Sequence, residues 1–263
     1  MSESVDWKEW PTAISHLIKT STSVYSTKRS PNPRKSALHL LNQAEVGYGD
    51  LGAHLDAYLG TCELDRRDQS LITELVYGVS RQRGFLDWQI DQFSQVKKIK
   101  PPTRAILRLA LYQLLFLDRI PDYAVVNTSV DFAKEADGAA AGRFVNGLLR
   151  NLIRSKNTLP SPSRENLVSY IALTTSHPEW MVRRWLARFG EEKTLVLCAS
   201  NNEIPPMTLR VNVLKTSREK LIEELRAAEI SAEPSPLSPD AVFVKGASVV
   251  SLPAFQRGDF YIQ

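Results

Sequence analysis

Lys100 to Asp118 read KPPTRAILRLALYQLLFLD, and this stretch decides the fold. Two prolines and Thr103 come first, as they do at the beginning of a helix, where proline has no intrahelical hydrogen bond to lose. The residues that follow are apolar almost all round, which is typical of a helix buried on every side. Arg108 and Gln113 interrupt the run, which is too short to span a bilayer. We therefore predict a helix at the centre of a bundle.

Other segments of helical period surround this helix from Arg34 to about Lys156. Residues 34–46 place four apolar side chains on one helical face. Residues 65–93 read as two helices, with Asp65 as the N-cap of the first and Gly84 near the break. Further helices are expected over 121–137 and 142–155. The pattern predicts six or seven helices in an all-α bundle of about 120 residues, an ordinary domain size.

The N-terminal residues 1–32 have a different composition from the bundle. They are rich in Ser and Thr and end among prolines, which favours a flexible tail over one docked through Trp7 and Trp10.

The residues after the bundle divide into two regions. A linker, NTLPSPS (157–163), sets a predicted boundary that makes residues 33–156 the helical domain. Two more helices are expected within 157–206, the second beginning at Pro178 and ending at Gly190. Beyond residue 206 the period changes to that of a strand (207–212), a charged helix (217–229) and a second strand (241–245). The fold class is thus mainly α, with residues 207–263 starting an α+β unit.

The last residues, GDFYIQ (258–263), resemble the beginning of a strand. Such a strand either pairs back into the chain or opens a further domain, because an unpaired apolar edge invites association. We expect the second case, in which Phe260 and Ile262 pair into or pack on a domain beyond this sequence.

Composition sets wide limits on function. The 263 residues are 43% apolar and 24% charged, and the net charge of +4 permits a polyanionic partner without requiring one. Cys62 and Cys198 provide neither a disulfide framework nor a metal-ligand spacing. Early acidic residues without an apolar run exclude a signal peptide. We expect a soluble cytoplasmic protein that does not contact membranes.

Residues 142–155, GRFVNGLLRNLIRS, carry the most informative polar face. Arg143, Gly147, Arg150 and Arg154 fall within about 60° of one another around the helix, opposite its apolar side. Three guanidinium groups beside a glycine suit a phosphate backbone, although a solvated helix face is the other interpretation.

A second basic cluster lies in KKIKPPTRAILR, which contains Lys97, Lys98, Lys100, Arg104 and Arg108 and no acidic residue. A helix start with this charge also offers backbone N–H groups to an anion. We predict nucleic-acid contact here as well.

Trp180 shares the polar side of its helix with Arg183 and Arg184. It could stack on a base, but a contact with a neighbouring domain is the favoured interpretation.

Catalytic and metal-binding patterns are absent from the sequence. It has no glycine-rich phosphate loop, no zinc-protease or paired-cysteine motif and no nucleophile elbow. Its four histidines are scattered, and both cysteines are expected to pack inertly. Asp87 and Asp91 are expected to be a solvated pair on a helix surface. We predict no catalytic residue, no metal site and no cofactor in this chain.

Successive stretches of the sequence resemble two known families. LVYGVSRQRGFLDWQI, ILRLALYQLLFLDRIPDYAVVNTSVDFAK and RFVNGLLRN resemble the NusB-type RNA-binding helical domain. HPEWMVRRW, NNEIPPMTLRVN and the final FYIQ resemble the RsmB/Sun type of 16S rRNA cytosine-5 methyltransferase. The resemblance implies an RNA partner, small-subunit rRNA, and S-adenosylmethionine as the cofactor of the full-length family member. The family's catalytic residues map onto nothing here.

We therefore expect the RNA-binding N-terminal portion of such a methyltransferase, truncated before its S-adenosylmethionine domain and inactive alone. The alternative is a stand-alone NusB-like module that binds RNA, or a ribosomal or transcription protein, in antitermination or ribosome biogenesis. The predicted RNA-binding residues are Arg34, Lys97, Lys98, Lys100, Arg104, Arg143, Arg150 and Arg154.

Overall fold

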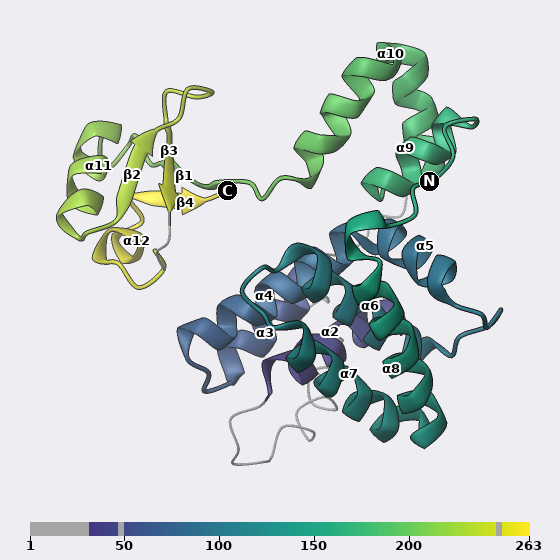
Figure 1. Ribbon diagram of the computed structural model, residues 1–263. Coiled ribbons are helices and arrows are strands. Elements are labelled where there is room, and N and C mark those ends of the chain that lie inside the picture. Colours follow the sequence, from purple (N-terminus) through teal and green to yellow (C-terminus); the bar gives the residue numbers. More distant parts are fainter. Residues whose placement is uncertain (1–31, 47–49, 246–248) are drawn as a thin grey trace, which may run out of the picture. The chain divides into compact units, whose positions relative to one another are not determined.

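The structure, a computed structural model, describes residues 32–46, 50–245 and 249–263. The predicted tail and its tryptophans, Trp7 and Trp10, therefore lie outside the described residues. The chain divides into two compact units, the second of which comprises Val196–Gln263 (Figure 1).

The first unit is helical, as predicted. Its elements are α2 (Pro33–Val46), α3 (Leu51–Thr61), α4 (Arg66–Arg81), α5 (Arg83–Phe93), α6 (Pro101–Phe116), α7 (Asp122–Asp137), α8 (Ala139–Arg154), the 3₁₀ helix η3 (Lys156–Thr158), α9 (Leu167–Thr175) and α10 (Glu179–Asn202), whose last residues belong to the second unit.

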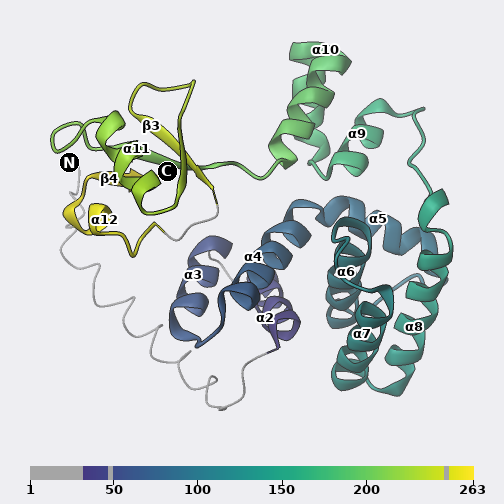
Figure 2. The same cartoon turned by 60° about the vertical axis from the view of Figure 1, so that its left-hand side comes forward.

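The central position of α6 is confirmed. It packs against α2, α4, α5, α7 and α8, and its residues 105–114 are all buried. The helices α7 and α8 lie side by side and complete this part of the bundle (Figure 2).

The predicted helix boundaries are mostly correct. Asp65 caps α4, because its side chain accepts a hydrogen bond from the backbone N–H of Asp68 at 2.7 Å. The break before α5 falls at Gln82, close to the expected Gly84. Gly190 has φ +76°, in the region that favours glycine, and marks a kink inside α10.

Contacts join the bundle to the helices that follow the predicted boundary at 156. The Phe85 backbone N–H donates to Ser176 Oγ at 2.8 Å, and Gln89 Nε2 donates to the Pro160 carbonyl at 3.0 Å. Helix α9 packs on α5, and the compact unit continues to Leu195.

The second unit is a four-stranded antiparallel sheet with two helices. Its elements are β1 (Met207–Val211), α11 (Arg218–Ala227), β2 (Ser231–Pro234), β3 (Ala241–Lys245), α12 (Pro253–Arg257) and β4 (Phe260–Ile262), and the strand order is β2-β3-β1-β4. Leu209, Val211, Val242 and Val244 from the strands share one apolar core with residues of α11 and α12. The expected strand, helix and strand are thus confirmed as β1, α11 and β3, and the unit contains β2, α12 and β4 in addition.

The expected pairing of the final strand, and the expected place of Phe260, are wrong. Strand β4 pairs back onto β1, with Phe260 opposite Val211 and Ile262 opposite Leu209. Phe260 is 1% exposed inside the core of this unit rather than left for another domain, because pairing with β1 turns its ring toward α12 and the ring of Phe255.

Candidate nucleic-acid interface

Helix α8 exposes its arginines to solvent, as the sequence pattern predicts. Its buried side, which includes Val145, Leu148, Leu149 and Leu152, packs into the bundle core. Arg143, Gly147, Arg150 and Arg154 are exposed, and we call these four residues the α8 strip. At a rise of 1.5 Å per residue the strip is about 16 Å long.

The charges of the α8 strip are not neutralised by other residues that the structure describes. No ion pair between described residues involves Arg143, Arg150 or Arg154, and Arg150 Nε donates to the half-buried Asn146 side chain at 3.0 Å. A Cβ built on Gly147 would meet no atom within 4 Å, so the space over the helix backbone is open. The strip can therefore receive an anionic chain at close range.

The second basic cluster is largely neutralised, contrary to its sequence-based interpretation. Lys100 Nζ lies 3.3 Å from Asp137, and Arg104 is 3.3 Å from Asp87 and 2.7 Å from Asp91. Asp87 and Asp91 are therefore ion-pair partners rather than a merely solvated pair. Lys97 and Lys98 are exposed.

Arg108 is buried and does not reach the surface. It is 8% exposed, forms a two-bond contact with Asp87 at 2.7 and 2.8 Å, and also pairs with Glu45. Its partners come from α2 and α5, so the guanidinium ties three helices together instead of facing a ligand.

The start of α6 offers little to an anion. Its first two residues, Pro101 and Pro102, have no N–H to offer. The carboxylate of Asp137 already lies there and accepts a hydrogen bond from Thr103 Oγ1 at 2.5 Å. This hydrogen bond, with Lys100 beside it, lowers the pKa of Asp137.

The Arg34 side chain joins two helices of the bundle. Its Nε donates to Oε1 of the buried Gln113 at 2.6 Å, which fixes α2 on α6. Burial lowers the pKa of Arg34. Of the eight residues predicted to bind RNA, five (Lys97, Lys98, Arg143, Arg150 and Arg154) are exposed basic groups without an ion pair among the described residues.

Trp180 is 63% exposed, and the neighbouring Arg183 lies 3.7 Å from Glu179. The choice between base stacking and a domain contact for Trp180 stays a prediction.

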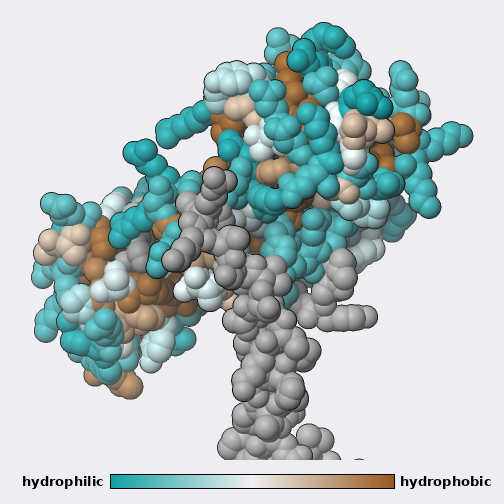
Figure 3. All heavy atoms as spheres, turned by 90° about the horizontal axis from the view of Figure 1, so that it is seen from below, coloured by the Kyte–Doolittle hydropathy of each residue, from teal (hydrophilic) through white to brown (hydrophobic). Residues whose placement is uncertain are grey.

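The described residues contain no group of three side chains that could hold a metal ion. Cys198 is fully buried, and Cys62 is half-buried at the end of α3. In the same part of the chain, no helix has both the length and the hydropathy needed to cross a membrane. Figure 3 shows hydrophilic side chains over most of the visible face, interrupted by apolar patches.

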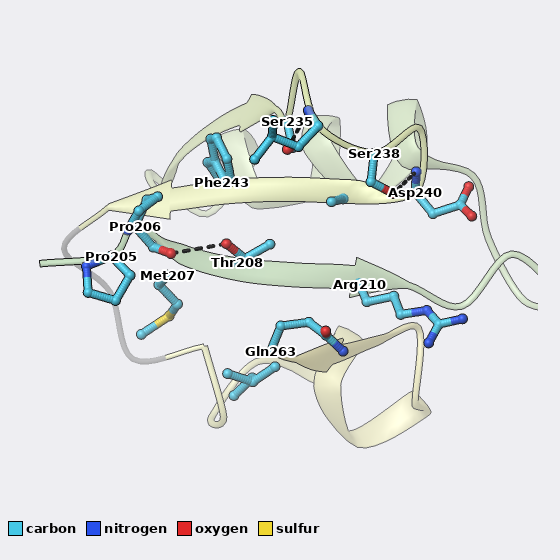
Figure 4. A pocket seen from close by; sticks show the side chains of 13 residues that line it. Pro205, Pro206, Met207, Thr208, Arg210, Ser235, Ser238, Asp240, Phe243 and Gln263 are labelled. Carbon is cyan, nitrogen blue, oxygen red and sulfur yellow. Dashed lines mark hydrogen bonds between the residues drawn. The ribbon is translucent and has the colours of Figure 1, made fainter. Parts of the chain in front are cut away.

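A hollow on the sheet of the second unit was not predicted. It has a volume of about 820 Å³ and is lined by Thr208, Arg210 and Phe243 of the two central strands and by the β2–β3 loop (Figure 4). The alternation in MTLRVN and AVFVK was the available signal, because it separates Leu209, Val242 and Val244 from these outward residues.

Comparison with known families gives two matches along the chain. Residues 31–154 match the NusB family, and residues 177–251 match the "Methyltr_RsmF/B-like, ferredoxin-like domain".

Relatives of the chain carry the names of ribosomal RNA methyltransferases. It is 34% identical over 232 residues to the probable ribosomal RNA small subunit methyltransferase B of Bacillus subtilis, covering 88% of this chain and 52% of that protein. It is 32% identical over 235 residues to the ribosomal RNA small subunit methyltransferase B of Pseudomonas putida, again covering 88% of this chain and 52% of the relative. The chain thus spans about half the length of these relatives.

A solved structure titled "Crystal Structure of PH0851" has the same fold over 90% of this chain and 54% of its own. The TM-score is 0.62 and the sequence identity 22%.

Proposed function

This chain joins a NusB-family domain to an RsmF/B-like ferredoxin-like domain, and from that premise we propose that it binds small-subunit ribosomal RNA on behalf of a cytosine-5 methyltransferase. A cytoplasmic location goes with this proposal. The α8 strip is the observation that carries it, because three exposed guanidinium groups lie along an open helix backbone without ion-pair partners among the described residues.

Contacts at the α8 strip are with the phosphate backbone rather than with base edges. The guanidinium groups are splayed along a convex helix surface, so they can follow a phosphate chain but form no pocket around a base. Lys97 and Lys98, in the connection that precedes α6, add charge of the same kind. Binding of this type is electrostatic and weakly selective for sequence.

The residues described here do not fit the methyl donor that the family implies. A nucleotide-type donor site needs a glycine-rich turn between a parallel strand and a helix. The turn from β1 to α11 reads NVLKTS and has no glycine, and the strand pairs of this sheet are antiparallel. The proposal therefore assigns RNA binding to these residues and no step of methyl transfer.

The alternative, a stand-alone NusB-like module, is less well supported. The match at residues 177–251 is to a methyltransferase-associated domain, and its folded sheet lies in the same chain as the helical bundle. This combination favours a role beside methyl transfer over antitermination.

The test is a titration of a small-subunit rRNA fragment containing a duplex stem, followed by fluorescence anisotropy. We expect Arg143→Glu, Arg150→Glu and Arg154→Glu together to weaken binding about tenfold or more, since three phosphate contacts become repulsive. Helical circular dichroism should stay unchanged because the three side chains are exposed.

A second triple variant controls for net charge. Arg66→Glu, Arg67→Glu and Arg119→Glu change the charge by the same amount at exposed positions on other parts of the bundle. This control should bind nearly as well as the wild type. Equal weakening by both triple variants would contradict the α8 strip as the contact surface.

A further inference from the structure

One face of the four-stranded sheet is not covered by the helices of its own unit. The core residues from the strands point toward α11 and α12. Thr208 and Arg210 alternate with these core residues along β1, and Phe243 does so along β3, so the three side chains project from the opposite face (Figure 4). This open face belongs entirely to the second unit.

Strand register brings complementary groups together on the open face. Phe243 lies directly opposite Thr208, and Arg210 lies opposite Ala241 on one side and Tyr261 on the other. The two central strands thus present an aromatic ring and a guanidinium group, with a second aromatic side chain, 57% exposed, on the edge strand. No ion pair between described residues involves Arg210.

The loop between β2 and β3 forms one wall of the hollow over this face. It contributes Ser235, Ser238 and Asp240, and Ser238 Oγ accepts a hydrogen bond from the Asp240 backbone N–H at 3.4 Å. The volume of about 820 Å³ falls in the range of small-ligand sites. Phe243 is half-buried and lines this hollow, and its cross-strand neighbour Thr208 is smaller than the ring.

We propose that this open face binds single-stranded RNA. One base stacks on Phe243, the adjoining phosphate pairs with Arg210, and Asp240 accepts hydrogen bonds from the exocyclic amino group of a base. Aromatic side chains on the central strands of a four-stranded sheet are suited to unstacked bases, since every base has a π face. The single cation among the lining residues matches one phosphate, and a carboxylate can accept from a base amino group but repels the phosphate backbone.

This inference deepens the proposed function and rests on it, because it assigns the single-stranded segments of the same RNA to a different unit from the α8 strip. Its test uses the full chain and a short fluorescein-labelled single-stranded RNA. We expect Phe243→Leu, which keeps an apolar side chain but removes the ring, to weaken binding about tenfold. Arg210→Gln should reduce the slope of log affinity against log salt by about 0.7, the value for one phosphate on a single strand.

A matched control lies on the other side of the same unit. Lys220→Gln also removes one exposed cation, on α11 rather than on the open face, and should leave both affinity and slope unchanged. Undiminished binding by folded Phe243→Leu protein would overturn the proposal.

Photo-crosslinking of the wild-type chain keeps the proposal testable if a variant fails to fold. An RNA carrying 5-iodouridine should crosslink to the peptides that contain Phe243 or Tyr261, and crosslinks confined to the helical unit would refute the proposal. The crosslink should persist in the triple variant of the α8 strip. Loss of duplex binding therefore reports on the α8 strip, and loss of this crosslink reports on the open face of the sheet.

Discussion

Gly147 is the residue at which folding stability and the proposed RNA binding make opposite demands. Glycine in a helix interior is less favourable than alanine by about 0.5–1 kcal/mol. Nothing in the bundle requires it, since a Cβ at this position meets no atom within 4 Å. We expect Gly147→Ala to raise the free energy of unfolding by about that amount and to lower affinity for duplex RNA several-fold, because the methyl group holds the phosphate chain away.

Gly60 provides the matched control for this prediction. It is also an exposed helical glycine with open space around it, in α3. Gly60→Ala should stabilise the protein in urea denaturation by a smaller amount, because Gly60 lies in the last turn of α3, and should leave RNA affinity unchanged. If Gly147→Ala binds RNA as well as Gly60→Ala does, the RNA does not approach the backbone of α8 at Gly147.

Arg108 makes the buried ion pairs that tie α6 to α2 and α5. Its side chain is 9% exposed, while those of Asp87 and Glu45 are 28% and 29% exposed. We expect Arg108→Met to lower the free energy of unfolding by about 2 kcal/mol, because two partly buried carboxylates lose their shortest ion pair. Asp87 keeps Arg104 and Glu45 keeps Arg83, each at 3.3 Å. Lys35→Met breaks a pair whose side chains are 59% and 63% exposed and should cost less than about 1 kcal/mol. Similar losses from both, in chemical denaturation, would show that Arg108 has no special role.

Asp137 gives the fold a defined dependence on pH. Its pKa lies below the ordinary value of 3.8, chiefly because Thr103 donates a hydrogen bond to the carboxylate. A group with a lowered folded-state pKa stabilises the protein above the unfolded-state pKa, and this contribution is lost as the pH falls through the folded-state pKa. Thr103→Val should therefore cost about 2 kcal/mol at pH 7 and progressively less below about pH 4.

Urea denaturation of wild type and Thr103→Val at several pH values measures this difference. A stability difference that stays constant down to pH 2 would mean that Thr103 acts through packing rather than through the Asp137 carboxylate.

At the scale of elements, helices were predictable and their long-range partners were not. The α8 strip lies on one helix, so its exposure followed from the period of the sequence alone. Arg104 and Arg108 looked free because no acidic residue is near them in the sequence, yet Asp87 and Glu45 reach them from α5 and α2. Local pattern cannot reveal a partner that only tertiary packing supplies.

The sheet shows the same limit. Strand β2, SAEP, has no aromatic or β-branched residue and forms because it pairs with β3. The hollow on the open face was missed for a related reason. The alternation of two strands separates its outward residues from the core, but its lining runs from Pro205 to Gln263 and converges only in the folded unit.

Helix α9 should stabilise the bundle, although the sequence suggested a boundary before it. A fragment of residues 32–156 lacks the Pro160 carbonyl that accepts from Gln89, and it uncovers the surface of α5 on which α9 packs. We expect it to unfold cooperatively, but at lower urea concentration than a fragment of residues 32–195. Identical midpoints would place the domain boundary at 156 after all.

At the scale of the whole molecule, the two units are suited to different parts of one RNA. The helical bundle presents basic side chains on a convex surface, which suits the regular backbone of a duplex. The sheet presents an aromatic ring and polar groups around a hollow, which suits bases that have left the helix. The proposed role, binding ribosomal RNA beside methyl transfer to a base, would use contacts of both kinds.

The central claim, that the α8 strip binds the RNA backbone, is tested most directly by the salt dependence of affinity for a duplex-containing rRNA fragment. If about four phosphates are neutralised, log affinity should fall against log salt with a slope of roughly −3 to −4. Reversal of Arg143, Arg150 and Arg154 to Glu should flatten this slope to about −1, while the control triple variant keeps the wild-type slope. The same slope for the wild type and for the α8 variant would contradict the account.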